Sequence, residues 1–295
     1  MGLVLIVGGV AAGVFGSLLG LGGGILIVPL LTLGFGRPIR EAVAVSLVCV
    51  IVTSSAASGA YLKGRVANLR LGTVLALFTT AGALVGGLLA FVIPERYLAG
   101  LFALLLVYVA LSMGRAGLKA SRAPADGADP VGVTGVDAMT GADATAGPAA
   151  TNGPDATDPG PEPAGRLDGS GYRVRRLVPA SFASLGAGVI AALVGVGGGI
   201  INVPTMNLMM GVPLRVATAT SNLMIGVTAV ASAIIYLLRG GLDPYLAGPT
   251  AIGVFVGASV GARVAHRVDV RVLRLLFVVV LTWTAFQMAR RALGI

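Results

Sequence analysis

The sequence predicts an all-α polytopic membrane protein built from two homologous repeats, and three observations support this prediction. Of the 295 residues, 56% are apolar and only 11% are charged, whereas charged residues make up about 25% of a soluble globular protein. Apolar stretches of membrane-spanning length recur along the chain. A shift of 175 residues also aligns the chain with itself without a gap.

Eight apolar stretches approach the ~20 residues that a helix needs to cross a bilayer. They are residues 2–19, 39–61, 70–93, 96–113, 175–194, 214–238, 244–265 and 272–289. Two shorter apolar stretches, 25–34 and 200–210, follow clusters of glycine. At ~1.5 Å per residue, each would reach about half-way across a bilayer. We therefore expect full spans combined with two half-length helices.

A polar segment separates the two sets of apolar stretches. Residues 114–173 are rich in Ala, Gly, Pro, Asp and Thr, and they hold eight of the twelve acidic residues. Such a composition cannot bury a core and predicts a disordered linker, which we place in the cytoplasm. The chain then divides into a first transmembrane repeat (1–113), the linker (114–173) and a second transmembrane repeat (174–295).

The repeat is clearest around the glycine clusters. Between residues 20–46 and 195–221, 14 of 27 positions are identical, and the matches include Pro29 with Pro204. A shared preference for small residues would not align prolines and arginines without gaps, so the pattern indicates internal duplication. Duplicated membrane units are typical of transporters, which bind substrate near the midplane where the broken helices of the two repeats meet.

Three consecutive glycines in each repeat predict a break in the membrane helix. The two clusters are Gly22, Gly23 and Gly24, and Gly197, Gly198 and Gly199. Glycine accepts the positive φ of a sharp corner and leaves backbone N–H groups accessible. We interpret residues 2–34 and 175–210 as V-shaped re-entrant hairpins with corners inside the membrane. The half-helix N-termini would then present unpaired N–H donors to an anion.

Close helix packing is the alternative role for glycine in a membrane helix. Gly82 and Gly86, with their counterparts Gly257 and Gly261, are better explained by packing because they stand inside full-length apolar stretches. The consecutive glycines stand beside half-length stretches instead. That setting favours a role in lining a site, although packing stays an open alternative for them.

The hairpins also predict how the two repeats are oriented. A hairpin that returns to its own side adds no net crossing, so each repeat crosses three times and the second repeat is inverted. With the linker in the cytoplasm, this arrangement places 15 of the 21 Lys and Arg residues inside, against 13 for parallel repeats. The positive-inside rule therefore favours inversion.

The net charge of +9 raises the question of nucleic-acid binding. The basic residues form short clusters between apolar runs, as at Lys63, Arg65 and Arg70, which is typical of membrane-flanking loops. One cysteine, Cys49, and one histidine, His266, argue against a disulfide, a metal site or a histidine-based triad. We expect no nucleic-acid partner, no enzyme activity, no catalytic residue, no metal and no cofactor.

Uncharged polar groups are the best candidates to bind a transported anion, because a fully charged pair in low dielectric would cost desolvation and release slowly. Asn202 is the most informative, since it replaces Ile27 of the first repeat inside a half-helix, where an amide is costly unless paired. An interhelical hydrogen bond is its alternative role. The other candidates are both glycine clusters, with Ser46, Ser221, Asn222, Thr53 and Thr218.

Arg40 and Arg215 occupy matched positions at the start of a span. A guanidinium group there could attract an anion to a vestibule, or it could anchor the helix at the interface. The centres of the predicted spans carry no Asp, Glu, Lys, Arg or His, and Cys49 is expected to be a buried small apolar side chain. A proton-coupled pump usually places a carboxylate or histidine at such a centre.

Three motifs resemble the sulfite exporter TauE/SafE family. They are Gly20-Leu-Gly22-Gly-Gly24-Ile-Leu-Ile-Val-Pro29, its second copy Gly195-Val-Gly197-Gly-Gly199-Ile-Ile-Asn-Val-Pro204, and Ala217-Thr-Ala-Thr-Ser221-Asn222. The resemblance covers the whole chain except the linker. It implies a multi-pass permease of the prokaryotic plasma membrane, made of four-helix repeats, that moves small sulfur-containing anions such as sulfite or organosulfonates. Members differ in cargo, so the substrate stays undefined.

The leading hypothesis is a secondary permease or exporter whose partners are the lipid bilayer and a small anion, with homo-oligomerisation left open. The alternative is a non-transporting structural or assembly subunit of the membrane, which would not need a duplicated glycine break. An intramembrane enzyme would need a nucleophile with a base. A single cysteine and a histidine in a basic loop do not supply them.

Overall fold

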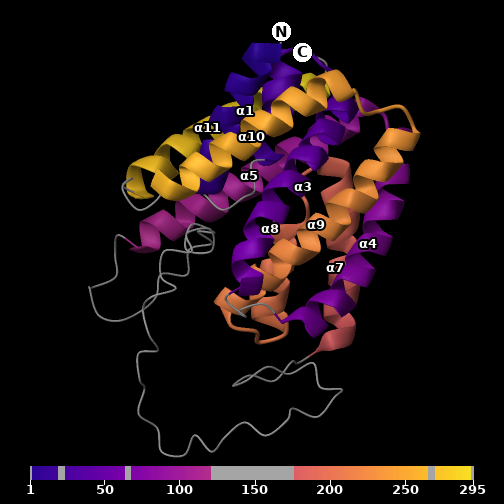
Figure 1. Ribbon diagram of the computed structural model, residues 1–295, viewed down its shortest axis with the longest axis vertical. Helices are drawn as coiled ribbons and strands as arrows, with labels where there is room; N and C mark the ends of the chain where they lie inside the picture. The colour runs from indigo at the N-terminus through magenta and orange to yellow at the C-terminus, as the bar shows by residue number, and fades with distance from the viewer. Residues whose placement is uncertain (1, 19–23, 64–67, 121–175, 265–269, 294–295) are drawn as a thin grey trace, which may run out of the picture.

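The computed structural model describes residues 2–18, 24–63, 68–120, 176–264 and 270–293, and every regular element in these ranges is a helix (Figure 1). Four of the described helices are long and apolar enough to cross a membrane. They comprise Leu69–Val92, Glu95–Ser112, Leu177–Val194 and Val216–Leu238. The prediction of an all-α fold with membrane-crossing helices is confirmed to this extent.

The helices of the first half begin at positions that the second half repeats. The first half contains α1 (Gly2–Leu18), α2 (Gly24–Pro29), η1 (Leu30–Gly34), α3 (Ile39–Lys63), α4 (Leu69–Val92) and α5 (Glu95–Ala120). The second contains α7 (Leu177–Val194), α8 (Gly199–Pro204), η3 (Thr205–Met209), α9 (Leu214–Leu238), α10 (Pro244–Val264) and α11 (Val270–Leu293). Each element of the second half starts 175 residues after its counterpart, so the shift found in the sequence also relates the helix starts.

Each proline of the half-length helices stands where the helix changes its winding. The α-helical turns of α2 end at Pro29 and continue into the π-helix η1, and α8 continues from Pro204 into η3 in the same way. Proline has no N–H to donate to the preceding turn, which is a common cause of such a change. The half-length helices are therefore residues 24–34 and 199–209, close to the predicted stretches.

The end of α5 differs from the expected start of the linker. Hydropathy falls after Met113, and the linker was expected from Gly114, but α5 continues to Ala120. Residues 114–120 read Gly-Arg-Ala-Gly-Leu-Lys-Ala. Arg, Ala, Leu and Lys favour helix, and they outnumber the two glycines, so a polar extension of the helix is sustained.

The two halves are interleaved through glycine-lined contacts. The first helix of each half packs along the fourth helix of the other, as α1 on α10 and α7 on α4. A Cβ on Gly257 would collide with the carbonyl of Val10, and one on Gly82 with the carbonyl of Leu185. A Cβ on Gly86 would lie 2.5 Å from the carbonyl oxygen of Val189. The packing role predicted for these glycines is therefore confirmed, because only glycine permits so close an approach.

The contacts also give the relative directions of the paired helices. Along α4 and α7, Gly82 meets Leu185 and Gly86 meets Val189, so the two helices run parallel. Along α1 and α10, Gly9 meets Gly253 and Gly13 meets Ala258, so this pair is parallel too.

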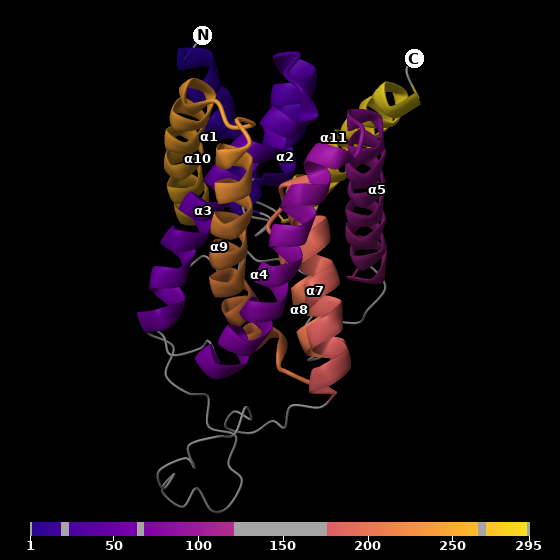
Figure 2. The same cartoon turned by 90° about the vertical axis from the view of Figure 1, so that its right-hand side faces the viewer.

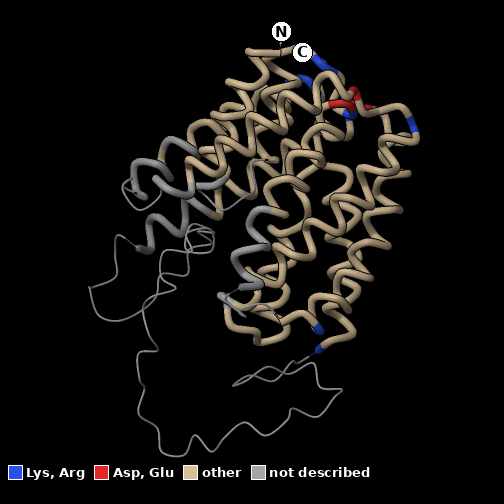
Figure 3. The backbone as a smooth tube through the Cα atoms, viewed as in Figure 1, with Lys and Arg blue, Asp and Glu red and all other residues tan. Residues whose placement is uncertain are grey.

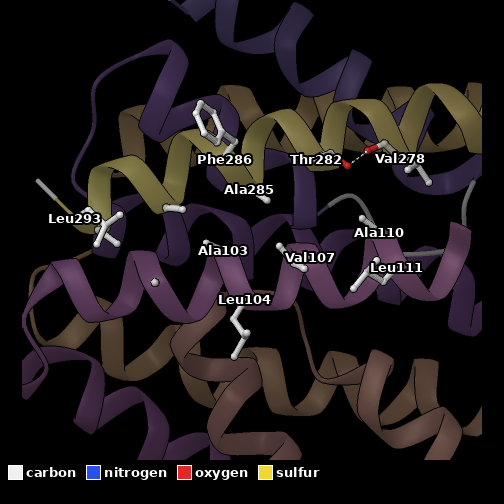
Figure 4. Close-up of a pocket in the computed structure, with 13 residues that line it drawn as sticks. Ala103, Leu104, Val107, Ala110, Leu111, Val278, Thr282, Ala285, Phe286 and Leu293 are labelled. Carbon is white, nitrogen blue, oxygen red and sulfur yellow. Dashed lines mark hydrogen bonds between the residues drawn. The ribbon is translucent and has the colours of Figure 1, made fainter. Parts of the chain in front are cut away.

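Helices α5 and α11 run in opposite directions. Gly100, near the start of α5, lies against Ala292, near the end of α11, and Figure 4 shows Leu111 beside the Val278 end. The start of α1 and the end of α11 lie at one end of the molecule, away from the start of α7 (Figure 2).

Charged residues are confined to the ends of the described helices (Figure 3). Every Asp, Glu, Lys and Arg in them lies within about two turns of a helix end, or roughly 11 Å along the axis. Hydrogen bonds and ring contacts bring Arg40, Arg239 and Arg291 to the same end of the molecule as Ile93 and Thr32. The uncharged span centres expected from the sequence are confirmed for the described residues.

Candidate functional site

The helix of the second half breaks between α7 and α8. Gly195, Gly197 and Gly198 have φ values of 77°, 80° and 77°, in the left-handed region that favours glycine. The Gly195 N–H donates to the carbonyl of Ala191 (2.8 Å) and closes α7. The N–H of Asn202 donates to the carbonyl of Gly198 (3.0 Å) and opens the short helix α8. The interruption thus falls in the cluster that the sequence singled out.

The break of the first half is described only in part. Gly22 and Gly23 lie outside the described residues, and Gly24 is the first residue of α2. A Cβ on Gly24 would lie 3.0 Å from the carbonyl oxygen of Gly195 and 3.0 Å from Ser46 Oγ. The beginning of α2 therefore touches the break of the other half.

Ser46 joins the two breaks. Its hydroxyl, which is fully buried, donates to the carbonyl of Gly195 (2.7 Å) and lies 3.0 Å from the carbonyl oxygen of Gly24. These carbonyls belong to different halves of the chain, separated by more than 100 residues. A single side chain of α3 thus satisfies backbone groups at the point where the two breaks meet.

Helices α3 and α9 cross beside this point. A Cβ on Gly197 would lie 2.6 Å from Ile225 and 2.9 Å from Val50, which are equivalent positions of the two halves. A Cβ on Gly199 would lie 2.5 Å from Ile225 and 3.6 Å from Ser221 Oγ. The site therefore brings together Gly24, Gly197, Gly199, Ser46 and Ser221.

Two polar atoms at the second break are buried without a partner. Asn202 and Ser221 are each 1% exposed, and neither Asn202 Oδ1 nor Ser221 Oγ has a hydrogen-bond partner among the described residues. The amide nitrogen of Asn202 lies 3.7 Å from where a Cβ on Gly198 would stand, on the side that faces α7. Leaving a buried polar group unsatisfied costs about 1–3 kcal/mol, so these atoms require an explanation.

The remaining predicted residues lie elsewhere or are engaged differently. The backbone carbonyl of Asn222 accepts a hydrogen bond from the hydroxyl of Ser54 (2.5 Å). Arg40 donates to the carbonyls of Ala90 (2.9 Å) and Ile93 (2.8 Å), at the end of α4 and away from the breaks. The side chain of Arg215 lies outside the described residues.

Sequence reasoning did not single out Gly195, Val50 or Ile225 as site residues. A signal for each was present. Gly195 aligns with Gly20 in the repeat, and Val50 and Ile225 stand one helical turn after Ser46 and Ser221, on the same helix faces. Cys49 is fully buried, as expected. Within the described ranges no group of three His, Cys, Asp or Glu side chains is placed to hold a metal ion.

These features define a polytopic α-helical membrane protein with uncharged polar groups buried at an interrupted helix. The model of the family described as Sulfite exporter TauE/SafE matches residues 5–288, and the chain belongs to this family. It is 25% identical to "Probable membrane transporter protein YunE" of Bacillus subtilis (strain 168), over 97% of this chain and 96% of that protein. No solved structure matches the chain. The protein is therefore a multi-pass membrane transporter, of a family that is not an enzyme class.

Proposed function

We propose that this transporter moves small anions across the prokaryotic plasma membrane, as a secondary permease or exporter of sulfite, organosulfonates or related sulfur-containing oxyanions. We place the bound anion near the midplane, between the two halves, at the glycine breaks. The pair of unpartnered buried polar groups, Asn202 and Ser221, is the observation that carries this proposal. Membership of the sulfite exporter family supports the substrate class.

The chemistry of these groups suits an oxyanion. The Ser221 hydroxyl and the Asn202 amide nitrogen can each donate a hydrogen bond without carrying a charge. The unpartnered Asn202 Oδ1 is an acceptor, and rotating the amide by 180° would put its NH2 group in that place to meet an oxyanion. An anion bound by neutral donors can be released more readily than one paired with a buried cation, whose separation in low dielectric is costly. The absence of charged residues from the centres of the described helices agrees with such a site.

We also propose that the two halves are inverted repeats. An inverted repeat turns equivalent full spans in opposite directions, and the antiparallel pairing of α5 with α11 supports this arrangement. The parallel pairing of α1 with α10 and of α7 with α4 agrees with it as well. Two repeats of the same orientation would make α5 and α11 parallel instead.

Re-entrant hairpins complete the proposed topology. The positive φ values at Gly195, Gly197 and Gly198 support a sharp reversal of the chain. Both α8 and η3 contact α7, as expected if the half-helix folds back against the helix before it. In the first half, α2 likewise contacts α1. The break would then lie inside the membrane, where freed backbone groups must face protein or a cavity.

Arg40 and its repeat counterpart Arg215 are each proposed to attract anions to a vestibule, at opposite ends of the molecule if the repeats are inverted. The guanidinium groups of Arg40 and Arg239 both stack on Phe91, at 5.9 Å from the ring centre. Two positive charges are thereby held around one ring at the same end of the molecule. A charge at the mouth raises the local concentration of anions without holding them at the midplane.

Transport by the purified full-length chain in proteoliposomes tests the proposal. Uptake of labelled sulfite, an organosulfonate and thiosulfate should exceed uptake by protein-free vesicles and saturate with concentration. If none of the three crosses faster than in protein-free vesicles, while the protein is correctly inserted, anion transport is refuted. The alternative of a non-transporting subunit would then be favoured.

A further inference from the structure

An open apolar groove of about 840 Å³ runs between α5 and α11, and no residue of the glycine breaks lines it (Figure 4). Its floor is made of small residues, which keep the two antiparallel helices close and leave a furrow over them. They are Gly100, Ala103, Ala110, Ala285, Ala289 and Ala292. The volume lies within the ~300–1,000 Å³ that is typical of ligand pockets in proteins.

The groove offers no polar group to an occupant. Thr282 is the polar residue of its lining, and its hydroxyl already donates to the carbonyl of Val278 (2.7 Å). Leu104, Phe286 and Leu293 border the groove with 67%, 61% and 74% of their surface exposed. In a membrane protein, exposed side chains of this kind face lipid, so the part of an occupant that fills the groove must be apolar.

The length of the groove matches one leaflet. Along α5 the lining runs from Gly100 to Leu111, which is about 16 Å at ~1.5 Å per residue. Half of the ~30 Å hydrocarbon core of a bilayer is about 15 Å. A molecule lying in the groove would therefore reach from the interface to the centre of the membrane.

The groove starts at a positively charged end. Arg96 precedes Gly100 by four residues, and Arg290 stands four residues after Phe286, so each lies one turn from the lining on the same helix face. Both arginines are exposed. Arg96 donates to the hydroxyl of Tyr97 (3.1 Å), whereas no hydrogen bond or ion pair among the described residues involves Arg290. Arg290 is thus available to an anionic partner.

We propose that this groove binds an anionic phospholipid, with an acyl chain lying between α5 and α11 and the phosphate held by Arg290 and Arg96. Guanidinium groups bind phosphate strongly, and basic side chains at the membrane surface favour anionic lipids. A second copy of this chain fits the groove less well. A copy related by an axis along the membrane normal would bring two more arginines to the same charged end.

Native mass spectrometry of the purified full chain tests the proposal, with dioleoyl phosphatidylglycerol and dioleoyl phosphatidylcholine as probes that share the same acyl chains. We expect retention of one phosphatidylglycerol per chain, in preference to phosphatidylcholine. Arg290→Gln should weaken phosphatidylglycerol binding about fivefold, the effect of one basic residue near a membrane surface, and leave phosphatidylcholine unchanged. Ala289→Phe, which fills the furrow, should weaken both lipids.

Matched variants serve as controls. Arg70→Gln removes an exposed arginine at the other end of the molecule, and Ala11→Phe adds the same bulk to an exposed alanine of α1. Neither should change lipid retention. Arg290 is a surface residue, so its substitution should not impair folding. The Arg290→Gln variant therefore tests binding of the lipid headgroup even if Ala289→Phe does not fold.

Two results would overturn the proposal. One is equal retention of phosphatidylglycerol by the wild type and by Arg290→Gln, in a chain whose melting temperature is unchanged. The other is a dimeric wild type that Ala289→Phe converts to a monomer without loss of lipid, which would make the groove an interface between copies of the chain.

Discussion

In the first repeat Ile27 stands three residues into the half-helix as a fully buried aliphatic side chain, and the equivalent position of the second repeat holds Asn202. The matched serines of α3 and α9 also differ, in whether their hydroxyl groups are hydrogen-bonded. Ser46 donates to a carbonyl of the opposite break, while Ser221 Oγ has no partner among the described residues. Two halves with matching helix starts thus differ in chemistry at their centre.

This difference between the two breaks indicates which of them binds the substrate. Each unpartnered buried polar atom costs about 1–3 kcal/mol. In the described part of the first break, Ile27 carries no polar group and the hydroxyl of Ser46 is hydrogen-bonded. The second break carries this cost at Asn202 and Ser221. A ligand that hydrogen-bonds to these two groups would offset the cost, so we expect the substrate to contact the second break more than the first.

Gly198→Leu should have the largest effect and abolish sulfite flux in proteoliposomes. A non-glycine residue at its φ of 77° is strained by roughly 1–2 kcal/mol, and the new Cβ would lie 3.2 Å from Ala191. Gly211→Leu is the matched control, because Gly211 has a φ of 70° in open space, outside the break. Equal flux in both variants, at equal insertion, would show that the break does not shape the pathway.

Asn202→Ile places at the second break the residue type that Ile27 supplies at the first. It should change transport and stability in opposite directions. We expect flux to fall at least about tenfold, as for one lost hydrogen bond of ~1.4 kcal/mol, and the melting temperature to rise because an unsatisfied carbonyl is removed. Ile27→Val, at the equivalent position, should change flux little. A lower melting temperature for Asn202→Ile would instead support an interhelical hydrogen bond.

The two serines should respond oppositely to alanine. Ser46→Ala removes a buried hydroxyl that satisfies backbone carbonyls and should lower the free energy of unfolding by about 1 kcal/mol. Ser221→Ala should raise the free energy of unfolding, because it removes a buried hydroxyl that has no partner among the described residues, and should reduce flux several-fold. Thermal unfolding and flux, measured on the same preparations, test both statements. The reverse pattern would move the anion to the first break.

Arg40→Gln should have the smallest effect on transport. We expect the KM for sulfite to rise about two- to threefold at low salt and the difference to vanish at high salt, because salt screens the long-range attraction of an anion through solvent. Stability should also fall, since the guanidinium hydrogen-bonds to Ala90 and Ile93. Arg37→Gln, three residues before Arg40, is the control, as Arg37 pairs with Glu41 at 3.8 Å. A loss of stability with an unchanged KM would assign Arg40 to capping α4.

Helix positions could be predicted well from this sequence because the bilayer imposes them. Runs of apolar residues predicted the long helices, four of which are long and apolar enough to cross a membrane among the described residues. The glycines and prolines predicted the half-length helices to within a few residues. The end of α5 was missed, since hydropathy does not report helix propensity beyond the membrane. Helix pairing was out of reach as well. That α1 packs on α10 depends on contacts between residues more than 200 positions apart, which no local pattern encodes.

The residues of the candidate site could be predicted from the sequence, but their hydrogen-bond partners could not. Ser46 and Ser221 are identical residues at matched positions, and nothing in the sequence distinguishes the bonded one from the unpartnered one. The distinction depends on which carbonyl of the opposite half lies within reach. Asn202 was identified because the repeat itself provides a reference residue, Ile27, at the same place.

The packing of α1 and α7 against helices of the opposite half has a consequence for how the protein assembles. Helix α1 packs on α10 and α7 packs on α4, so neither half contains both members of these glycine-lined helix pairs. A half-length ancestor would have been a pair of identical subunits, each lending a helix to the other. Separately expressed residues 1–120 and 174–295 should accordingly reconstitute the transporter only when produced together.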